Sequence, residues 1–184
     1  MSRSRAIALA LVALLAIAPA AADQNDPRLD DLFEQLKGAP DHVAAQSAEA
    51  AIWGIWYEHE DHAIEQLMFK SRAAMDRRDF RSALRSIDQV IALAPDFAEG
   101  WNLRATLYYL MGNYKASLAD IKETLAREPR HFGALSGRGL VYSQLDEPEL
   151  ALESFEEALA VNPQMPGPRI NAEAIRKELE DREI

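Results

Sequence analysis

The sequence has no cysteine at any of its 184 positions. Disulfides therefore contribute nothing to its stability, a cysteine nucleophile is excluded, and no lipid can be attached through an N-terminal cysteine. An oxidising compartment is compatible with this composition, because a chain without thiols has nothing to oxidise there.

Positive charge is also scarce. The chain carries 20 Lys and Arg residues against 30 Asp and Glu residues, for a net charge of −10 at pH 7. Such a balance disfavours contact with phosphate backbones and with anionic lipid headgroups. We therefore expect no nucleic acid as the partner.

The motifs of common catalytic sites are missing as well. The sequence has no G-x-S-x-G elbow and no glycine-rich phosphate loop. His59 and His62 stand close together, but the second histidine comes one residue too early for the zinc motif H-E-x-x-H. We predict that the protein is not an enzyme and uses no cofactor. A metal-dependent or hydrolytic site at His59 and His62 is the remote alternative.

Long apolar runs are absent except near the N-terminus. The run Ala6–Ala18 follows two arginines and precedes the small residues Ala20–Ala22. At 13 residues it is shorter than the roughly 20 needed to cross a bilayer. The pattern predicts a signal peptide, residues 1–22, cleaved after Ala22, and no stable membrane insertion afterwards. A retained membrane anchor is the alternative. Export without disulfides or a lipid favours the periplasm, with release to the medium as the other possibility.

The remaining chain contains a repeat of 34 residues. Pro95, Pro129 and Pro163 are separated by this interval, which divides the chain into units 64–97, 98–131 and 132–165. Small residues occupy positions 8 and 20 of every unit: Ser71, Ala105 and Gly139, then Ala83, Ser117 and Ala151. Large residues, including Trp101 at position 4, are expected to be buried between units. Proline at position 32 ends the second of two predicted helices.

The second unit carries the fullest pattern, with Trp101, Ala105, Tyr108, Gly112 and Pro129 at positions 4, 8, 11, 15 and 32. This resembles the tetratricopeptide repeat, a helix-turn-helix unit. The resemblance implies an all-α fold, in which hairpins stack into a right-handed superhelix. It also implies a protein-binding function in general and names no partner.

Both flanks of the repeats are predicted to be helical. Residues 23–63 suggest a degenerate N-terminal hairpin, in which Trp53 and Trp56 are expected to pack on Ile64–Arg77 and close that end of the stack. A ligand-stacking role for the two tryptophans is the sharper alternative. Residues 166–184 suggest a C-terminal capping helix, since such arrays need a polar cover for their last apolar face. The total is nine helices and no strands.

The resemblance also implies a concave groove lined by the first helix of each unit. The groove residues that we select are Met68, Arg72, Met75, Asn102, Thr106, Tyr109, Ser136, Leu140 and Ser143. This mixed surface suits an extended peptide or a short helix. The hypothesis is a periplasmic adaptor that binds a protein or peptide of the cell envelope. One alternative is an accessory subunit that docks through its convex or end surface; another is a merely solvated groove, with Arg72 neutralising Glu65 or Asp76.

The signal peptide leads to the first testable prediction. The mature protein is expected to begin at Asp23 and to be released by osmotic shock of the producing cells. Mass spectrometry of the released protein measures the N-terminus directly. A chain that keeps residues 1–22 and sediments with the membrane fraction would contradict the prediction and favour the anchored alternative.

Overall fold

In the computed structural model of the protein, residues 23–182 are described; the predicted signal peptide lies outside this range. These residues form nine helices and no strand. The helices are α1 (Arg28–Lys37), α2 (His42–Tyr57), α3 (His62–Asp76), α4 (Phe80–Leu93), α5 (Ala98–Leu110), α6 (Tyr114–Arg127), α7 (Phe132–Gln144), α8 (Pro148–Val161) and α9 (Pro166–Arg182). Among these helices, none combines the length and the apolar character that crossing a bilayer would demand.

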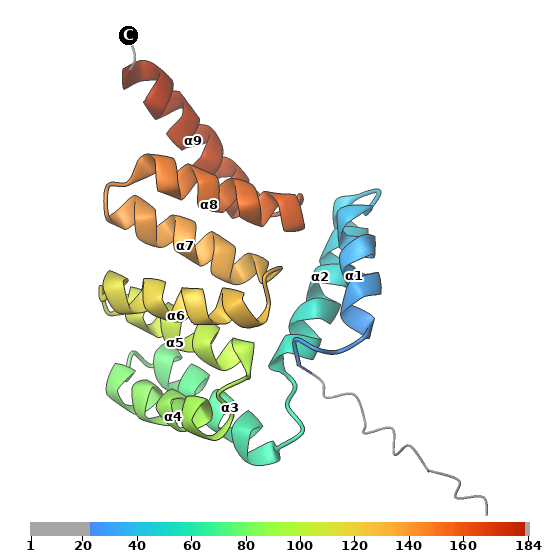
Figure 1. Cartoon of the computed structure of the whole chain (residues 1–184), viewed down its shortest axis with the longest axis vertical. Helices are drawn as coiled ribbons and strands as arrows, with labels where there is room; N and C mark the ends of the chain where they lie inside the picture. The colour runs from blue at the N-terminus through green and yellow to red at the C-terminus, as the bar shows by residue number, and fades with distance from the viewer. Residues whose placement is uncertain (1–22, 183–184) are drawn as a thin grey trace, which may run out of the picture.

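The stack is built from three hairpins, α3–α4, α5–α6 and α7–α8, as the repeat predicts (Figure 1). Each hairpin turn has a residue with positive φ at repeat position 15: Arg78 at 57°, Gly112 at 73° and Asp146 at 60°. The next helix is then capped in two of the three turns, where the Asp79 and Asn113 side chains accept backbone N–H groups. Each hairpin ends two residues before the repeated proline.

Small residues hold the two helices of each hairpin close together. The Ser71 hydroxyl donates to the Ala83 carbonyl at 3.1 Å, and the Ser117 hydroxyl donates to the Ala105 carbonyl at 2.8 Å. All four residues are buried. The hydroxyls thus join the two small positions of one repeat, which is why neither position has room for a large side chain.

Trp101 departs from the prediction that it is buried. Its indole is half-buried, and its N–H donates to the Pro95 carbonyl at 2.8 Å. The guanidinium groups of Arg104 and Arg127 lie over the ring at 5.1 and 4.8 Å from its centroid. The prediction was wrong because the indole N–H finds its acceptor at the exposed turn between two hairpins, where arginines, instead of apolar residues, cover the ring.

Arg104 also ties the first two hairpins together. It bonds Asp120 of its own hairpin at 2.7 Å and Asp88 of the preceding hairpin at 2.8 Å. The hydrogen bonds that Arg104 donates to Asp120 and, to a smaller degree, to Asp88 hold the pKa of Arg104 above its ordinary value.

The N-terminal hairpin forms but does not extend the stack. Helices α1 and α2 pack through residues such as Leu36 and Ile52, and Figure 1 shows the pair standing beside the stack with their axes along its length. Trp53 and Trp56 contact Phe132, with ring centroids 5.5 and 5.1 Å apart. The prediction that these tryptophans pack on Ile64–Arg77 is therefore wrong.

The physical reason lies in the sequence of α2. Continuing the 34-residue register backwards puts Glu49 at position 20, where the stacked hairpins have a small buried residue. In α2 the small residue buried with α1 is Ala48, one position earlier, and Glu49 instead bonds Asn162. The hairpin therefore departs from the repeat register that the stacked hairpins share. At the opposite end the chain does follow the stack: α9 covers α8, with Ala172 and Ile175 packed in one cluster with Phe155.

The close helix contact leads to a matched pair of glycine substitutions. A Cβ on Gly139 would lie 2.6 Å from two ring atoms of the buried Phe155, whereas a Cβ on Gly54 of α2 would have no neighbour within 4 Å. We expect Gly139→Ala to destabilise the protein by about 1–3 kcal/mol through overpacking. Gly54→Ala should stabilise by about 0.5–1 kcal/mol, because alanine favours a helix. Urea unfolding followed by circular dichroism measures both. A Gly139→Ala chain as stable as the parent would contradict the close packing.

Candidate functional site

A pocket lies between α5 and α7 on the face lined by the first helices of the hairpins. Its volume is about 200 Å³. It is lined by Asn102, Ala105, Thr106, Tyr109, Ser117, Ile121, Gly133, Ala134, Ser136, Gly137, Leu140 and Met165. The structure therefore brings together five of the nine selected groove residues: Asn102, Thr106, Tyr109, Ser136 and Leu140.

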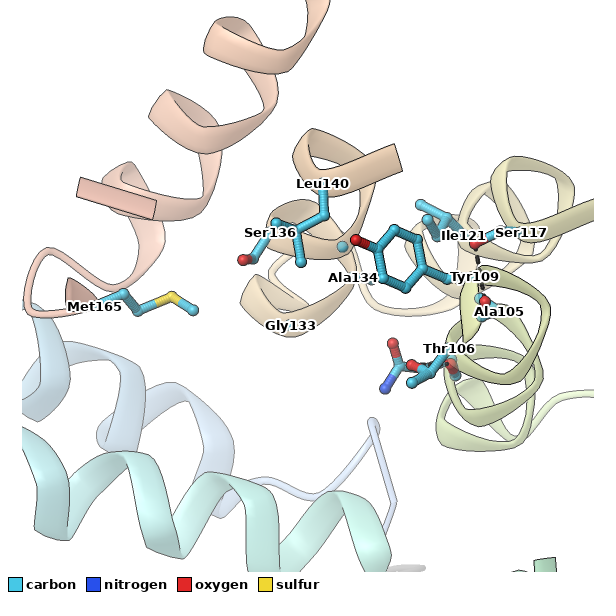
Figure 2. Close-up of a pocket in the computed structure, with 12 residues that line it drawn as sticks. Ala105, Thr106, Tyr109, Ser117, Ile121, Gly133, Ala134, Ser136, Leu140 and Met165 are labelled. Atoms are coloured by element: carbon cyan, nitrogen blue, oxygen red, sulfur yellow. Dashed lines mark hydrogen bonds between the residues drawn. The ribbon is translucent and has the colours of Figure 1, made fainter. Parts of the chain in front are cut away.

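Figure 2 shows how the pocket is enclosed. The Tyr109 ring extends from α5 toward α7, and the Met165 side chain extends toward the same space from the turn before α9. The repeat did not indicate Met165, because this residue is the last of its unit and belongs to no groove position. The one feature of the sequence that could have placed Met165 near the groove is its position at the end of the third unit, just before Pro166.

The lining of this pocket is mostly apolar and carries no charged side chain. Two of its hydroxyls are already bonded: Thr106 donates to the Asn102 carbonyl at 3.0 Å, and Ser117 to the Ala105 carbonyl. Within residues 23–182, the hydroxyls of Tyr109 and Ser136 have no hydrogen-bond partner. The pocket thus combines an apolar floor with two polar groups that are available to a ligand.

Two more of the selected residues, Met68 and Arg72, line a second hollow of about 420 Å³ together with Tyr57, Glu65, Phe69, Ala73 and Asp76. The guanidinium of Arg72 lies 4.3 Å from the ring centroid of Tyr57 in α2. Among the described residues Arg72 makes no ion pair, and Glu65 instead bonds His62 at 2.8 Å. The alternative in which Arg72 neutralises Glu65 or Asp76 therefore lacks the contact that it needs.

The last two selected residues line neither hollow. Met75 is half-buried against the core of the first hairpin. The Ser143 hydroxyl donates to the Gly139 carbonyl at 2.9 Å, so it is engaged within its own helix.

A buried polar cluster lies next to the pocket. The Glu99 carboxylate accepts a hydrogen bond from the Asn102 amide at 2.8 Å and is 3.0 Å from Nε2 of His131. His131 also caps α7, because its Nδ1 accepts the N–H of Ala134 at 3.1 Å. With Nδ1 accepting, the ring proton is on Nε2 and is donated to Glu99. His131 thus serves both as the cap of α7 and as a partner of Glu99.

The N-terminal hairpin closes this cluster. The Trp56 ring is stacked on the His131 ring, with centroids 4.1 Å apart and planes at 9°. Burial raises the pKa of the Tyr57 phenol, and the nearby carboxylate of Glu99 adds to the rise. Burial of Glu99 was not predicted, because a glutamate in the first turn of a helix is normally exposed.

The side chains of His59 and His62 form hydrogen bonds with residues close to them in the sequence. His62 Nδ1 bonds Glu65, and His59 Nδ1 accepts the backbone N–H of Asp61 at 3.0 Å. Across residues 23–182, no three His, Asp or Glu side chains gather closely enough to hold a metal ion.

Comparison with known proteins agrees with the repeat. Models of a family described as "Tetratricopeptide repeat" match residues 70–119 and 133–165. A TPR repeat-containing protein of Rhizobium etli is 42% identical over 136 residues, which are 74% of this chain and 67% of that protein. The human SGT1 homolog is 30% identical over 96 residues, which are 52% of this chain and only 26% of that protein.

Solved structures show the same fold. The TPR domain of Sgt2 from Aspergillus fumigatus has a TM-score of 0.63 at 19% identity, over 67% of this chain and 83% of that one. The first TPR of Spaghetti (RPAP3), bound to the HSP90 peptide SRMEEVD, has a TM-score of 0.62 at 17% identity, over 66% of this chain and 96% of that one. At these identities the likeness concerns the fold alone.

The buried cluster leads to a stability prediction with an internal control. Glu99→Ala would leave the His131 Nε2–H and the Asn102 amide without their acceptor, and we expect it to cost about 2–3 kcal/mol. Glu65→Ala alters the same repeat position one hairpin earlier, where the bond to His62 is on the surface. It should cost less than about 1 kcal/mol. Thermal unfolding of both variants measures the two losses in stability. Equal losses would mean that the cluster is not closed in solution.

Proposed function

The chain belongs to the tetratricopeptide-repeat family, and on that basis we propose that it is a periplasmic, non-enzymatic adaptor that binds a protein or peptide of the cell envelope in its concave groove. The observation that carries the proposal is the pocket between α5 and α7, to which two successive hairpins contribute Asn102, Thr106, Tyr109, Ser136 and Leu140. The N-terminal segment of the sequence supports the periplasmic location.

The chemistry of the pocket indicates how the partner is held. A cavity of about 200 Å³ with an uncharged lining suits one large apolar side chain of the partner. The Tyr109 and Ser136 hydroxyls in its lining suit polar groups of the partner beside that residue. Tyrosine supplies much contact area at a low entropic cost, which makes Tyr109 the expected main contributor.

The preferred ligand is expected to differ from that of the RPAP3 domain. The HSP90 peptide bound there has three acidic residues in its sequence SRMEEVD. The pocket between α5 and α7 offers no cation to such a peptide, since its lining has no charged side chain. Arg72, in the neighbouring hollow, is suited to a single carboxylate of the partner. An apolar anchor with one nearby acidic residue is therefore the proposed motif.

A second candidate is an accessory subunit that docks through the hairpin turns. Four exposed apolar side chains lie at or next to the turns of the second and third hairpins: Leu110, Met111, Leu145 and Leu150. Exposed apolar residues that gather in one region are a common sign of a protein contact. In this case the groove would be incidental.

Two leucines distinguish the groove from other surfaces by the same substitution. Leu140 lines the pocket, whereas Leu93 is an exposed leucine at the end of α4. We expect Leu140→Ala and Tyr109→Ala each to weaken partner binding at least tenfold, which is about 1.4 kcal/mol, while Leu93→Ala leaves it unchanged. The partner is captured from a periplasmic extract of the producing organism and titrated by calorimetry, after circular dichroism has shown that each variant is folded.

If Leu140→Ala and Tyr109→Ala retain the parental affinity while Leu110→Ala or Leu145→Ala loses it, the groove proposal fails and the hairpin turns are the binding surface.

A further inference from the structure

Helix α2 and the segment after it cover the concave surface near the N-termini of α3, α5 and α7. Repeat position 2, near the N-terminus of the first helix of each hairpin, is occupied by Glu65, Glu99 and Gly133. Glu65 accepts the backbone N–H of His59 at 3.5 Å, and Glu99 is buried in the cluster that Trp56 closes. A Cβ on Gly133 would lie only 2.7 Å from the Trp53 ring. The segment thus covers the same position in all three hairpins.

Helix α2 has two faces that contact different parts of the molecule. The face formed by Ala45, Ala48, Ile52 and Ile55 is buried with α1 in the core of the hairpin. The residues that contact the stack are Glu49, Trp53, Trp56 and Tyr57. Their spacing of i, i+4, i+7 and i+8 is that of a helix bound in a groove. Because the first face stays covered by α1, departure of the hairpin from the stack would expose the second face, with the buried Trp56, and Phe132 of α7, while the packing of α1 on Ile52 and Ile55 is kept.

Among the described residues, two side-chain hydrogen bonds join α1 and α2 to the stack, one at the buried Asn162 and one at the surface. Asn162 donates to Glu49 at 3.0 Å, and Arg130 pairs with Asp30 at 2.6 Å. The indole N–H of Trp56 is buried and has no hydrogen-bond partner among the described residues. A buried donor without an acceptor weakens the closed arrangement relative to one in which the donor meets water or an acceptor of another molecule.

We propose that α2 is a built-in, displaceable occupant of the concave surface, and that the partner replaces it with an amphipathic helix carrying two aromatic residues three or four positions apart. The proposal rests on the groove function and specifies the class of its ligand. Trp53 and Trp56 are three positions apart and mark the seat, formed by His131, Phe132 and Gly133, that the partner's aromatic residues would take.

The hairpin then sets the affinity for the partner. A ligand that binds only the open form has its affinity reduced by the fraction of molecules that are open. If about 1% of the molecules are open, binding is weakened about 100-fold. Removing the aromatic anchors of α2 should therefore strengthen binding, and fixing the hairpin in place should abolish it.

The absence of cysteine makes the hairpin easy to fix. Glu49→Cys/Asn162→Cys places the only two thiols at side chains that are in contact, where a short bismaleimide can join them. The matched control, Asp31→Cys/Glu34→Cys, receives the same crosslinker within α1 and leaves the hairpin free to move. The released form is Trp53→Ala/Trp56→Ala. The probe is a fluorescein-labelled peptide with the sequence of residues 41–58, titrated by fluorescence anisotropy.

We expect the released chain to bind the probe at least tenfold more tightly than the parent. The Glu49→Cys/Asn162→Cys chain should lose at least tenfold in affinity on crosslinking, whereas the α1 control should not change. Equal binding by the locked and the released chains, including no binding by either, overturns the proposal. A concentration-dependent dimer of the released chain with exchanged hairpins would make a second copy the occupant and overturn the assignment of a separate partner.

The groove function and its control by the hairpin can fail separately. Leu140→Ala changes the α5–α7 pocket and not the seat of α2, so it should lower the affinity for the captured envelope partner. If the locked chain still binds that partner with parental affinity and Leu140→Ala does not, the groove function holds and the role of the hairpin is refuted.

Discussion

The close approach of two helices at repeat positions 8 and 20 is the constraint on which the rest of this molecule depends. Ser71 and Ser117 each bond a carbonyl across this contact, and Gly139 lies against the Phe155 ring. The contact fixes the angle within each hairpin, and three similar angles in sequence produce a stack with one continuous face. Only on such a face do α5 and α7 present Tyr109 and Leu140 to the same pocket.

The N-terminal hairpin shows what happens where this constraint is not met. With Glu49 in place of a small residue, α2 departs from the repeat register, and its aromatic residues lie on the beginning of α7. The bond from Asn162 gives Glu49 a polar partner there. The same helix therefore buries Trp56 and leaves the pocket between α5 and α7 open. Recognition and its control would then arise from a single departure from the repeat.

The sequence allowed the stack to be predicted because the features that define it are local and periodic. Proline at position 32 and small residues at positions 8 and 20 recur every 34 residues, and the structure has a hairpin for each repeat. The seat of α2 could not be predicted, because it depends on single contacts between distant residues, such as Glu49 with Asn162 at a separation of 113 residues. Burial of Glu99 was missed for the same reason, since its partner His131 is 32 residues away, at the start of the third hairpin. Five of the nine selected groove residues share one pocket because the repeat register fixes helix faces, and Met165 was missed because it lies outside that register.

Hydrogen–deuterium exchange of the protein, with and without its captured partner, tests most directly the claim that the partner binds in the groove and displaces α2. The account predicts slower exchange in residues 102–109 and 133–140, which line the pocket, together with faster exchange in residues 41–57 as α2 leaves its seat. Slower exchange confined to the hairpin turns, with both groove segments and α2 unchanged, would contradict it.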